Sequence, residues 1–254
     1  DEAAEALDAA AVGLLKTSGA DYLEYRRPVR AHADWVRKNG LYANFSRPML
    51  EDADEDLLQI PRKQRAVVRK ALKNEILAVR IDASVDDFYR LYSLNVRNLG
   101  TPVFSKRFFQ ELVKTFGADC EILTITADGK PVSSVMSFYH RDAVMPYFTG
   151  SRVEARRLGA NDFMYWHVMR RAVDKGYTVF DFGRSKEDTG PFSFKKNWGF
   201  TPVPIAHEFC LKEGTEMPDL NPPNPKYAAM VATWKRLPLP VANFIGPLVV
   251  RNIG

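Results

Sequence analysis

Cysteine and histidine are scarce in this sequence, and neither is arranged for chemistry. The 254 residues include two cysteines, Cys120 and Cys210, and four histidines that lie far apart. Such spacing predicts neither a metal centre nor a Ser-His-Asp triad, and two separate thiols are typical of a reducing compartment. We therefore expect no metal site and a cytoplasmic location.

Long apolar runs are also absent. No stretch of about 18 apolar residues occurs, so the sequence predicts no membrane-spanning helix, and its start lacks the pattern of a signal peptide. With 46% hydrophobic residues, the chain still has enough apolar surface for one or two buried cores. Because it begins at Asp1 rather than methionine, we expect that earlier residues have been removed.

Apolar periodicity and turn residues predict an α/β fold with a mixed sheet. Residues 128–129 and 141–142 mark tight turns between three successive strands. Ser84 and Ser105 are expected to cap helices. The expected strands are 21–27, 41–46, 77–81, 121–127, 131–140, 143–150, 177–182 and 203–212, and the expected helices are 1–16, 60–75, 84–98, 105–116, 161–175 and 225–236.

The most informative stretch is DFGRSKEDTGPFSFKKNWGF, from Asp181 to Phe200. It leads from a strand through a polar loop into an aromatic segment that carries Lys195 and Lys196. An ammonium among aromatic rings is partly desolvated and can stabilise negative charge on a carbonyl oxygen. The alternative is that the rings fill the core while the lysines reach water. The pattern leaves both interpretations open.

Three further residues are candidates for substrate binding. Arg184 follows the strand that ends near Asp181, and its guanidinium would suit a carboxylate or phosphate. The alternative for Arg184 is a structural ion pair. Asp181 would either face the site or cap the following loop, and Tyr147 would line a substrate groove or pack in the core. The string DFG is not a kinase signature here, because the other kinase motifs are missing.

The turn before the helix at 161–175 is a candidate anion site. Its sequence RRLGAN, with Arg156, Gly159 and Asn161, resembles the pyrophosphate-binding turn Q/R-x-x-G-x-G/A of acetyltransferases. Backbone N–H groups at the start of a helix bind anions. The resemblance implies coenzyme A binding by these three residues, but Asn161 departs from the pattern. An ordinary helix start explains the segment equally well.

The segment 51–76 joins an acidic run, EDADED, to a basic helix. Val68 and Leu72 are expected to pack inward. The interpretations that remain are a solvated face whose acids and bases compensate one another, a surface for a phosphorylated substrate, and a contact with anionic lipid. The cations that share one helical face are Arg62, Arg65, Arg69 and Lys73.

Several segments together resemble a known family. Residues 84–211 resemble the C-terminal catalytic-type domain of the Fem family, the aminoacyl transferases that build peptidoglycan cross-bridges. They also resemble Fem-like acyltransferases with the acetyltransferase (GNAT) fold, in particular the branch associated with exopolysaccharide and exosortase loci. The matching segments are GTPVFSKRFF at 100–109, YFTGSR at 147–152, RRLGANDFMYWHVMRRAVDKG at 156–176, DFG at 181–183 and FKKNWGF at 194–200.

The resemblance implies an order of domains. Residues 1–50 are expected to be the C-terminal part of a first acetyltransferase-like domain, so Tyr22 and Phe45 would lack part of their cover. Residues 51–76 are a helical bridge, and 77–212 form a complete acetyltransferase-like domain. Residues 213–254 form a proline-rich tail whose amphipathic helix packs on the body or contacts a membrane or partner.

The resemblance also implies a reaction. An amine or hydroxyl of a cell-envelope or exopolysaccharide precursor would attack an activated acyl group, with Lys195, or else Lys196, stabilising the oxyanion. The donor would be aminoacyl-tRNA or acyl-coenzyme A, held by cations such as Arg184. One alternative is a coenzyme A-dependent acetyltransferase of polysaccharide synthesis. The other is a non-catalytic scaffold that docks a membrane-bound assembly, at the inner face of the membrane or on polysaccharide-synthesis proteins.

Overall fold

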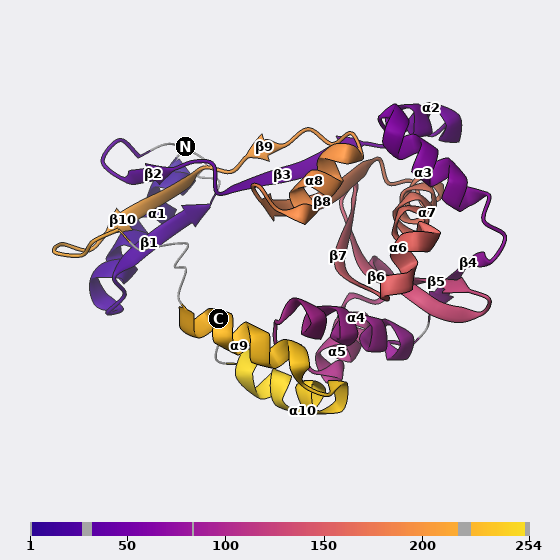
Figure 1. The fold of residues 1–254 in the computed structure, drawn as a ribbon. Helices are drawn as coiled ribbons and strands as arrows, with labels where there is room; N and C mark the ends of the chain where they lie inside the picture. Colours follow the sequence, from indigo (N-terminus) through magenta and orange to yellow (C-terminus); the bar gives the residue numbers. More distant parts are fainter. Residues whose placement is uncertain (1, 27–31, 83, 218–224, 252–254) are drawn as a thin grey trace. The chain divides into compact units, whose positions relative to one another are not determined.

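The computed structural model describes residues 2–26, 32–82, 84–217 and 225–251 (Figure 1). Contacts divide the chain into two compact units, and each combines segments that are distant in sequence. Strands β3 and β8 run from one unit into the other. Unit 1 is Asp1–Phe45, Arg184–Phe194 and Thr201–Pro222, and unit 2 is Ser46–Gly183, Lys195–Phe200 and Pro223–Gly254.

Unit 2 is built on a mixed sheet, which confirms the predicted α/β fold. Strands β4 to β7 form an antiparallel meander, and β7 then pairs in parallel with β8. The turn between β5 and β6 has positive φ angles of 48° at Asp128 and 75° at Gly129, as the Asp-Gly pair predicts. The sheet order is β4-β5-β6-β7-β8-β3-β9, with β3 at Tyr42–Pro48, β4 at Leu77–Asp82, β5 at Cys120–Ala127, β6 at Lys130–His140, β7 at Ala143–Ser151, β8 at Val179–Lys186 and β9 at Val203–Pro204.

Helices cover both faces of this sheet (Figure 1). Met136 of β6 packs with Phe88 and Phe109 of the helices α4 and α5, whereas the Ser133 hydroxyl donates to Asn161 of α7. Odd and even residues of β6 therefore face opposite sides of the sheet, toward α7 and toward α4 and α5 respectively. A Cβ on Gly150 of β7 would lie 2.3 Å from a backbone nitrogen of α4, so only glycine permits this close packing. These helices are α4 at Asp86–Leu99, α5 at Lys106–Phe116 and α7 at Ala160–Asp174.

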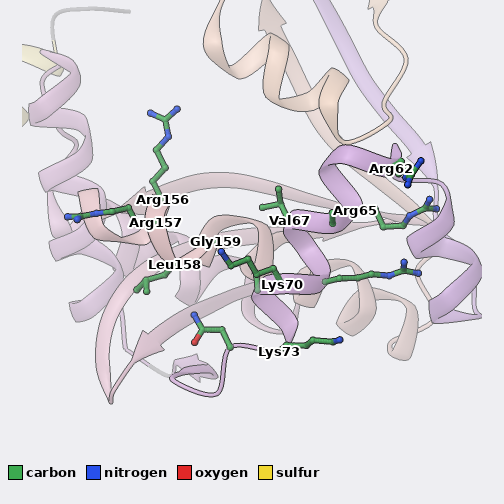
Figure 2. Close-up of a pocket in the computed structure, with 13 residues that line it drawn as sticks. Arg62, Arg65, Val67, Lys70, Lys73, Arg156, Arg157, Leu158 and Gly159 are labelled. Atoms are coloured by element: carbon green, nitrogen blue, oxygen red, sulfur yellow. The ribbon is translucent and has the colours of Figure 1, made fainter.

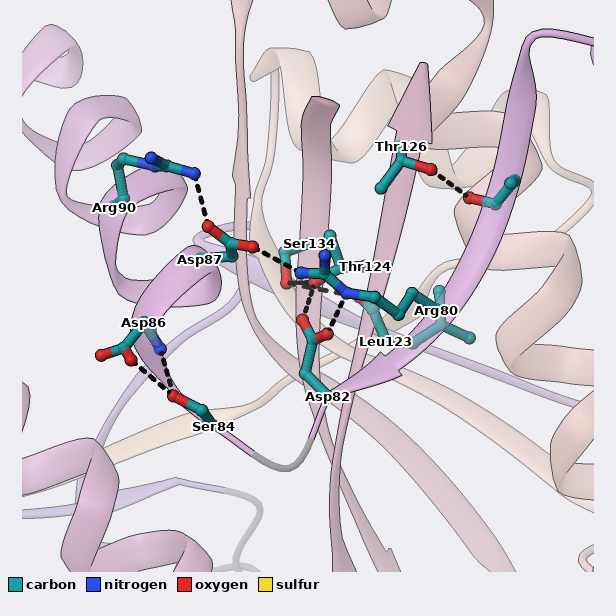
Figure 3. A network of polar contacts seen from close by, with 11 residues as sticks. Arg80, Asp82, Ser84, Asp86, Asp87, Arg90, Leu123, Thr124, Thr126 and Ser134 are labelled. Atoms are coloured by element: carbon teal, nitrogen blue, oxygen red, sulfur yellow. Dashed lines mark hydrogen bonds and ion pairs between the residues drawn. The ribbon is translucent and has the colours of Figure 1, made fainter. Parts of the chain in front are cut away.

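A polar network holds the junction between β4 and α4 (Figure 3). Asp82 accepts from Arg80 and from the Thr124 hydroxyl, and Asp87 pairs with Arg80 and Arg90. Ser105 caps α5 as predicted, by accepting from the backbone N–H of Phe108. Ser84 does not occupy the N-cap of α4, which is Val85, although the Ser84 hydroxyl still accepts from the N–H of Asp86.

Unit 1 contains a separate antiparallel sheet in the order β1-β10-β2, with α1 packed beside β1. Phe45, the last residue of the first segment of unit 1, is fully buried and lies edge-on to Phe192, at 5.1 Å between ring centroids. The expectation that Phe45 lacks cover is therefore wrong. The predicted strand 203–212 is two strands, β9 at Val203–Pro204 and β10 at His207–Leu211. The other elements are α1 at Glu2–Thr17, β1 at Tyr22–Arg26 and β2 at Val36–Lys38.

Several elements differ from the prediction. Residues expected to form a loop after Gly183 continue β8 to Lys186, and the aromatic segment that carries Lys195 and Lys196 forms a helix, α8. Helix α10 was not expected, and it packs with α9 against α4. No helix among the described residues is both long and apolar enough to cross a membrane. The remaining elements are α2 at Ala53–Leu58, α3 at Arg62–Leu72, η1 at Gly117–Asp119, α6 at Val153–Leu158, α8 at Gly190–Asn197, α9 at Pro225–Arg236 and α10 at Leu239–Val250.

Candidate functional site

A pocket of about 1110 Å³ in unit 2 joins the basic helix to the predicted anion-binding turn. We call it the basic pocket. Figure 2 shows the cations of α3 on one side, Arg156 and Arg157 on the other, and Gly159 between them. None of the thirteen residues that line it is acidic. Its cations are Arg62, Arg65, Arg69, Lys70, Lys73, Arg156 and Arg157.

The acidic run before α3 does not neutralise this pocket. Asp56 of that run is fully buried and accepts from Arg47 at 2.8 Å, with Arg170 at 3.5 Å. Among the described ion pairs, none joins residues 51–56 to a cation of the basic pocket. The described contacts therefore contain no ion pair by which the acids of 51–56 would compensate the cations of the basic pocket. The lining of the pocket therefore combines seven cations with no acidic residue, and such a surface attracts anions.

Gly159 makes the basic pocket by letting α3 approach α7. It ends α6 in the left-handed conformation, with φ of 68°, and starts α7 directly. A Cβ here would lie 3.1 Å from the Cβ of Ala71 on α3. Val68 and Ala71 form the buried side of α3, whereas Leu72 is 36% exposed, so the expectation that Leu72 packs inward is wrong.

Asp162 connects the basic pocket to the segment that carries Lys195. It lies in the first turn of α7, and its Oδ1 accepts from Gln64 of α3 at 2.6 Å and from the indole of Trp198 at 3.0 Å. Burial raises the pKa of this carboxyl, and the two hydrogen bonds oppose that rise. Asn161 does not line the pocket, because its side-chain oxygen accepts from Ser133 at 2.7 Å.

Lys195 is buried and Lys196 is exposed. The Nζ atom of Lys195 donates to the carbonyls of Phe182 at 2.7 Å and Gly183 at 3.1 Å. Burial lowers the pKa of Lys195 to about 8, against the opposing effect of Asp181. A pKa of about 8 keeps this amine mostly charged at neutral pH, although it loses its proton more readily than an exposed lysine.

The carbonyls that hold Lys195 lie where β7 and β8 part. The two strands pair only at Ala143 with Val179 and at Val144 with Phe180. Phe182 and Gly183 lie beyond this paired segment, after Asp181. Parallel strands that separate leave backbone groups available to a ligand or side chain.

The other predicted substrate-binding residues, Asp181, Arg184 and Tyr147, do not line the basic pocket. Asp181 caps locally, since its carboxylate accepts from the N–H of Gly183 at 2.8 Å. Arg184 is part of β8 in unit 1, where its guanidinium lies 5.2 Å from the ring centroid of Tyr42. Tyr147 is 68% exposed and lines a second pocket, of about 570 Å³ and largely aromatic, beside α5.

The comparisons with known proteins identify the domain that contains these residues. The family model of the acetyltransferase (GNAT) domain matches residues 59–196, which is more than half of the chain. The chain belongs to this family. The match begins just before α3 and ends at Lys196, so it contains the basic pocket and Lys195.

Solved structures show the same fold at low sequence identity. FemX has a TM-score of 0.60 and 16% identity, over 77% of this chain and 67% of that chain. A C-terminal domain from Agrobacterium fabrum, described as belonging to a lysylphosphatidylglycerol synthetase, has a TM-score of 0.59 and 14% identity, over 80% and 72%. A conserved protein of unknown function from Bacteroides thetaiotaomicron VPI-5482 has a TM-score of 0.54 and 10% identity, over 82% and 75%. No curated protein matches the sequence.

Sequence reasoning missed four residues of this site. Lys70 and Arg157 line the basic pocket, and Gln64 and Asp162 connect α3 and α7 to Trp198, which directly follows α8. Arg157 directly follows the predicted Arg156, so its charge was visible in the sequence. Nothing in the sequence indicates that Asp162 accepts from Trp198, because the two lie 36 positions apart.

Proposed function

We propose that this protein is an acyltransferase whose donor carries phosphate groups that bind in the basic pocket. The observation that carries the proposal is the meeting of seven cations with the turn at Gly159, inside a GNAT-family domain. Phosphate oxygens would accept from the guanidinium groups and from backbone N–H groups at the start of α7. Acyl-coenzyme A and aminoacyl-tRNA both offer this chemistry.

The reaction is direct transfer to an amine or hydroxyl. The acceptor nitrogen or oxygen forms a bond to the acyl carbon, and the bond from that carbon to the donor sulfur or oxygen breaks. The acceptor's proton leaves with the donor group or to solvent. The Lys195 ammonium stabilises the oxyanion of the tetrahedral intermediate. A cysteine intermediate is disfavoured at Cys120, because burial raises the pKa of its thiol to about 11.

The acceptor class in this proposal rests on the resemblance of the sequence to the Fem family and not on the pocket. We propose a precursor of the cell envelope or of an exopolysaccharide, which presents an amine or hydroxyl. A coenzyme A-dependent acetyltransferase of polysaccharide synthesis is the version of this proposal in which the donor is acetyl-coenzyme A. GNAT-family membership supports that version, and the resemblance of the sequence to the Fem aminoacyl transferases supports the aminoacyl version.

Single-turnover transfer tests the proposal, with radiolabelled acetyl-coenzyme A in one arm and aminoacyl-tRNA in the other. Soluble amino sugars and peptidoglycan precursors serve as acceptors. We expect one arm to give labelled product, and the double variant Arg69→Gln/Arg156→Gln to lose at least about 10-fold in rate at subsaturating donor. Arg107→Gln is the matched control, because Arg107 is 86% exposed on α5, outside the pocket. No product in either arm, or equal loss in the control, would contradict the proposal.

A further inference from the structure

Helix α10 shows its large apolar residues to solvent and its small residues to the protein. Ala242 and Gly246 are buried, whereas Val241 is 39% exposed and Phe244 is 78% exposed. A Cβ on Gly246 would lie 2.9 Å from the backbone of Val103, so this side of α10 is fitted closely to unit 2. A surface helix of a water-soluble protein has the opposite arrangement, with its apolar stripe turned to the core.

The same helix has no charged residue from Leu239 to Val250. Its one side-chain amide, on Asn243, donates to the Ser93 hydroxyl of α4 at 3.4 Å and so points toward the protein. The outward face that contains Val241 and Phe244 is therefore apolar. Exposed apolar faces of this kind mark contacts with another molecule or with lipid.

The charged residues that flank this face along the chain are all positive. Residues 225–251 contain no Asp or Glu. Lys235 and Arg236 are exposed in the last turn of α9, directly before α10, and Arg251 is exposed at the C-terminal end of α10. An apolar helix face with cations at both ends complements an anionic lipid surface, where the cations meet headgroups and the apolar side chains enter the acyl boundary.

We propose that α9 and α10 dock on an anionic membrane surface, with the outward face of α10 inserted. Helix α10 has 12 residues, hence a length of about 18 Å, which is too short to cross a hydrocarbon core of about 30 Å. It therefore lies along the interface, held to α4 by its small-residue side. The docking surface goes beyond the proposed acyl transfer and does not depend on it.

Vesicle co-sedimentation tests the proposal with the full chain. The vesicles are pure phosphatidylcholine, or phosphatidylcholine with about 30% phosphatidylglycerol as the anionic lipid. We expect binding to the anionic vesicles, weakened by salt. Phe244→Glu should weaken this binding at least about 10-fold, because the apolar ring that would leave water on insertion is gone. The double variant Lys235→Gln/Arg236→Gln should weaken binding by about 10-fold or more, because it loses two cations that meet anionic headgroups.

Tyr147→Glu is the matched control, because Tyr147 is an aromatic residue that is 68% exposed on a different surface, that of β7. Both glutamate variants should keep the melting temperature, since neither side chain is buried. The proposal is overturned if the wild type ignores anionic vesicles, or if Phe244→Glu binds them as the wild type does. It is also overturned if light scattering shows a dimer that Phe244→Glu separates while no vesicle binding occurs, since the face would then join two copies of the chain.

Discussion

Replacing Lys195 by methionine separates what this residue costs the fold from what it contributes to chemistry. Burial lowers its pKa from 10.5 to about 8, which corresponds to a penalty of about 3 kcal/mol for holding the charged form at neutral pH. Methionine removes that penalty but leaves the carbonyls of Phe182 and Gly183 without this donor, a loss of about 1–3 kcal/mol. We expect the free energy of unfolding at pH 7 to stay within about 2 kcal/mol of wild type.

The free energy of unfolding should also depend on pH through Lys195. Between pH 8 and 10.5 the unfolded chain keeps the Lys195 proton while the folded chain has lost it, so stability rises with pH across this window. The rise approaches about 3 kcal/mol and should be missing in Lys195→Met. Urea unfolding of both proteins at steps from pH 7 to 10.5 measures the difference, and Lys196→Met should follow the wild type.

Turnover should change far more than stability does. Loss of one oxyanion donor from an acyl-transfer site costs about 100-fold or more in rate, so Lys195→Met should be folded and almost inactive. Lys196→Met should retain most activity, because that side chain is exposed. Unchanged turnover in Lys195→Met would refute the catalytic role and favour a structural or scaffold role. A parallel pH profile for wild type and Lys195→Met would refute the reasoning about its buried charge.

Three further predictions concern stability, each checked by urea unfolding. Gly150→Ala should destabilise unit 2 by about 2 kcal/mol or more, because its Cβ would overlap the α4 backbone; a change within about 0.5 kcal/mol would contradict this. Asp56→Ala should cost about 3–5 kcal/mol by leaving Arg47 buried without its carboxylate, whereas a neutral effect would show that water reaches Arg47. The carboxylates around His32, chiefly Glu208, raise its pKa, so its contribution should be complete below about pH 6.5 and fall as pH rises through the raised value; His32→Gln should remove that slope.

The order of strands and helices in unit 2 could be predicted because local signals agree with the tertiary structure. The Asp128-Gly129 turn and the Ser105 cap act over a few residues, so the sequence alone identifies them. Helix α10 was missed because its prolines and lack of charge resemble an extended tail, and it is helical through packing of Gly246 on Val103. Asp56 was grouped with a solvated acidic run, because its partners Arg47 and Arg170 come from distant elements.

The candidate site was predictable only in parts. The cations of α3 and the turn at Gly159 were each identified as anion-binding candidates, for separate reasons. They line one pocket because Gly159 packs closely against Ala71 of α3. These two residues lie 88 positions apart, so no local sequence pattern indicates the contact. The neighbours Lys195 and Lys196 look alike in sequence, and only the turn of α8 buries one and exposes the other.

Equilibrium binding of a phosphate-bearing donor to the basic pocket tests the account most directly. Coenzyme A and tRNA are titrated in parallel into the wild type, into Arg69→Gln/Arg156→Gln and into Arg107→Gln. We expect that at least one of the two ligands binds, that its affinity falls with salt, and that only the double variant weakens binding by about 10-fold or more. Failure of both ligands to bind the wild type, or equal affinity in the double variant and the control, would contradict the assignment of the basic pocket as the donor site.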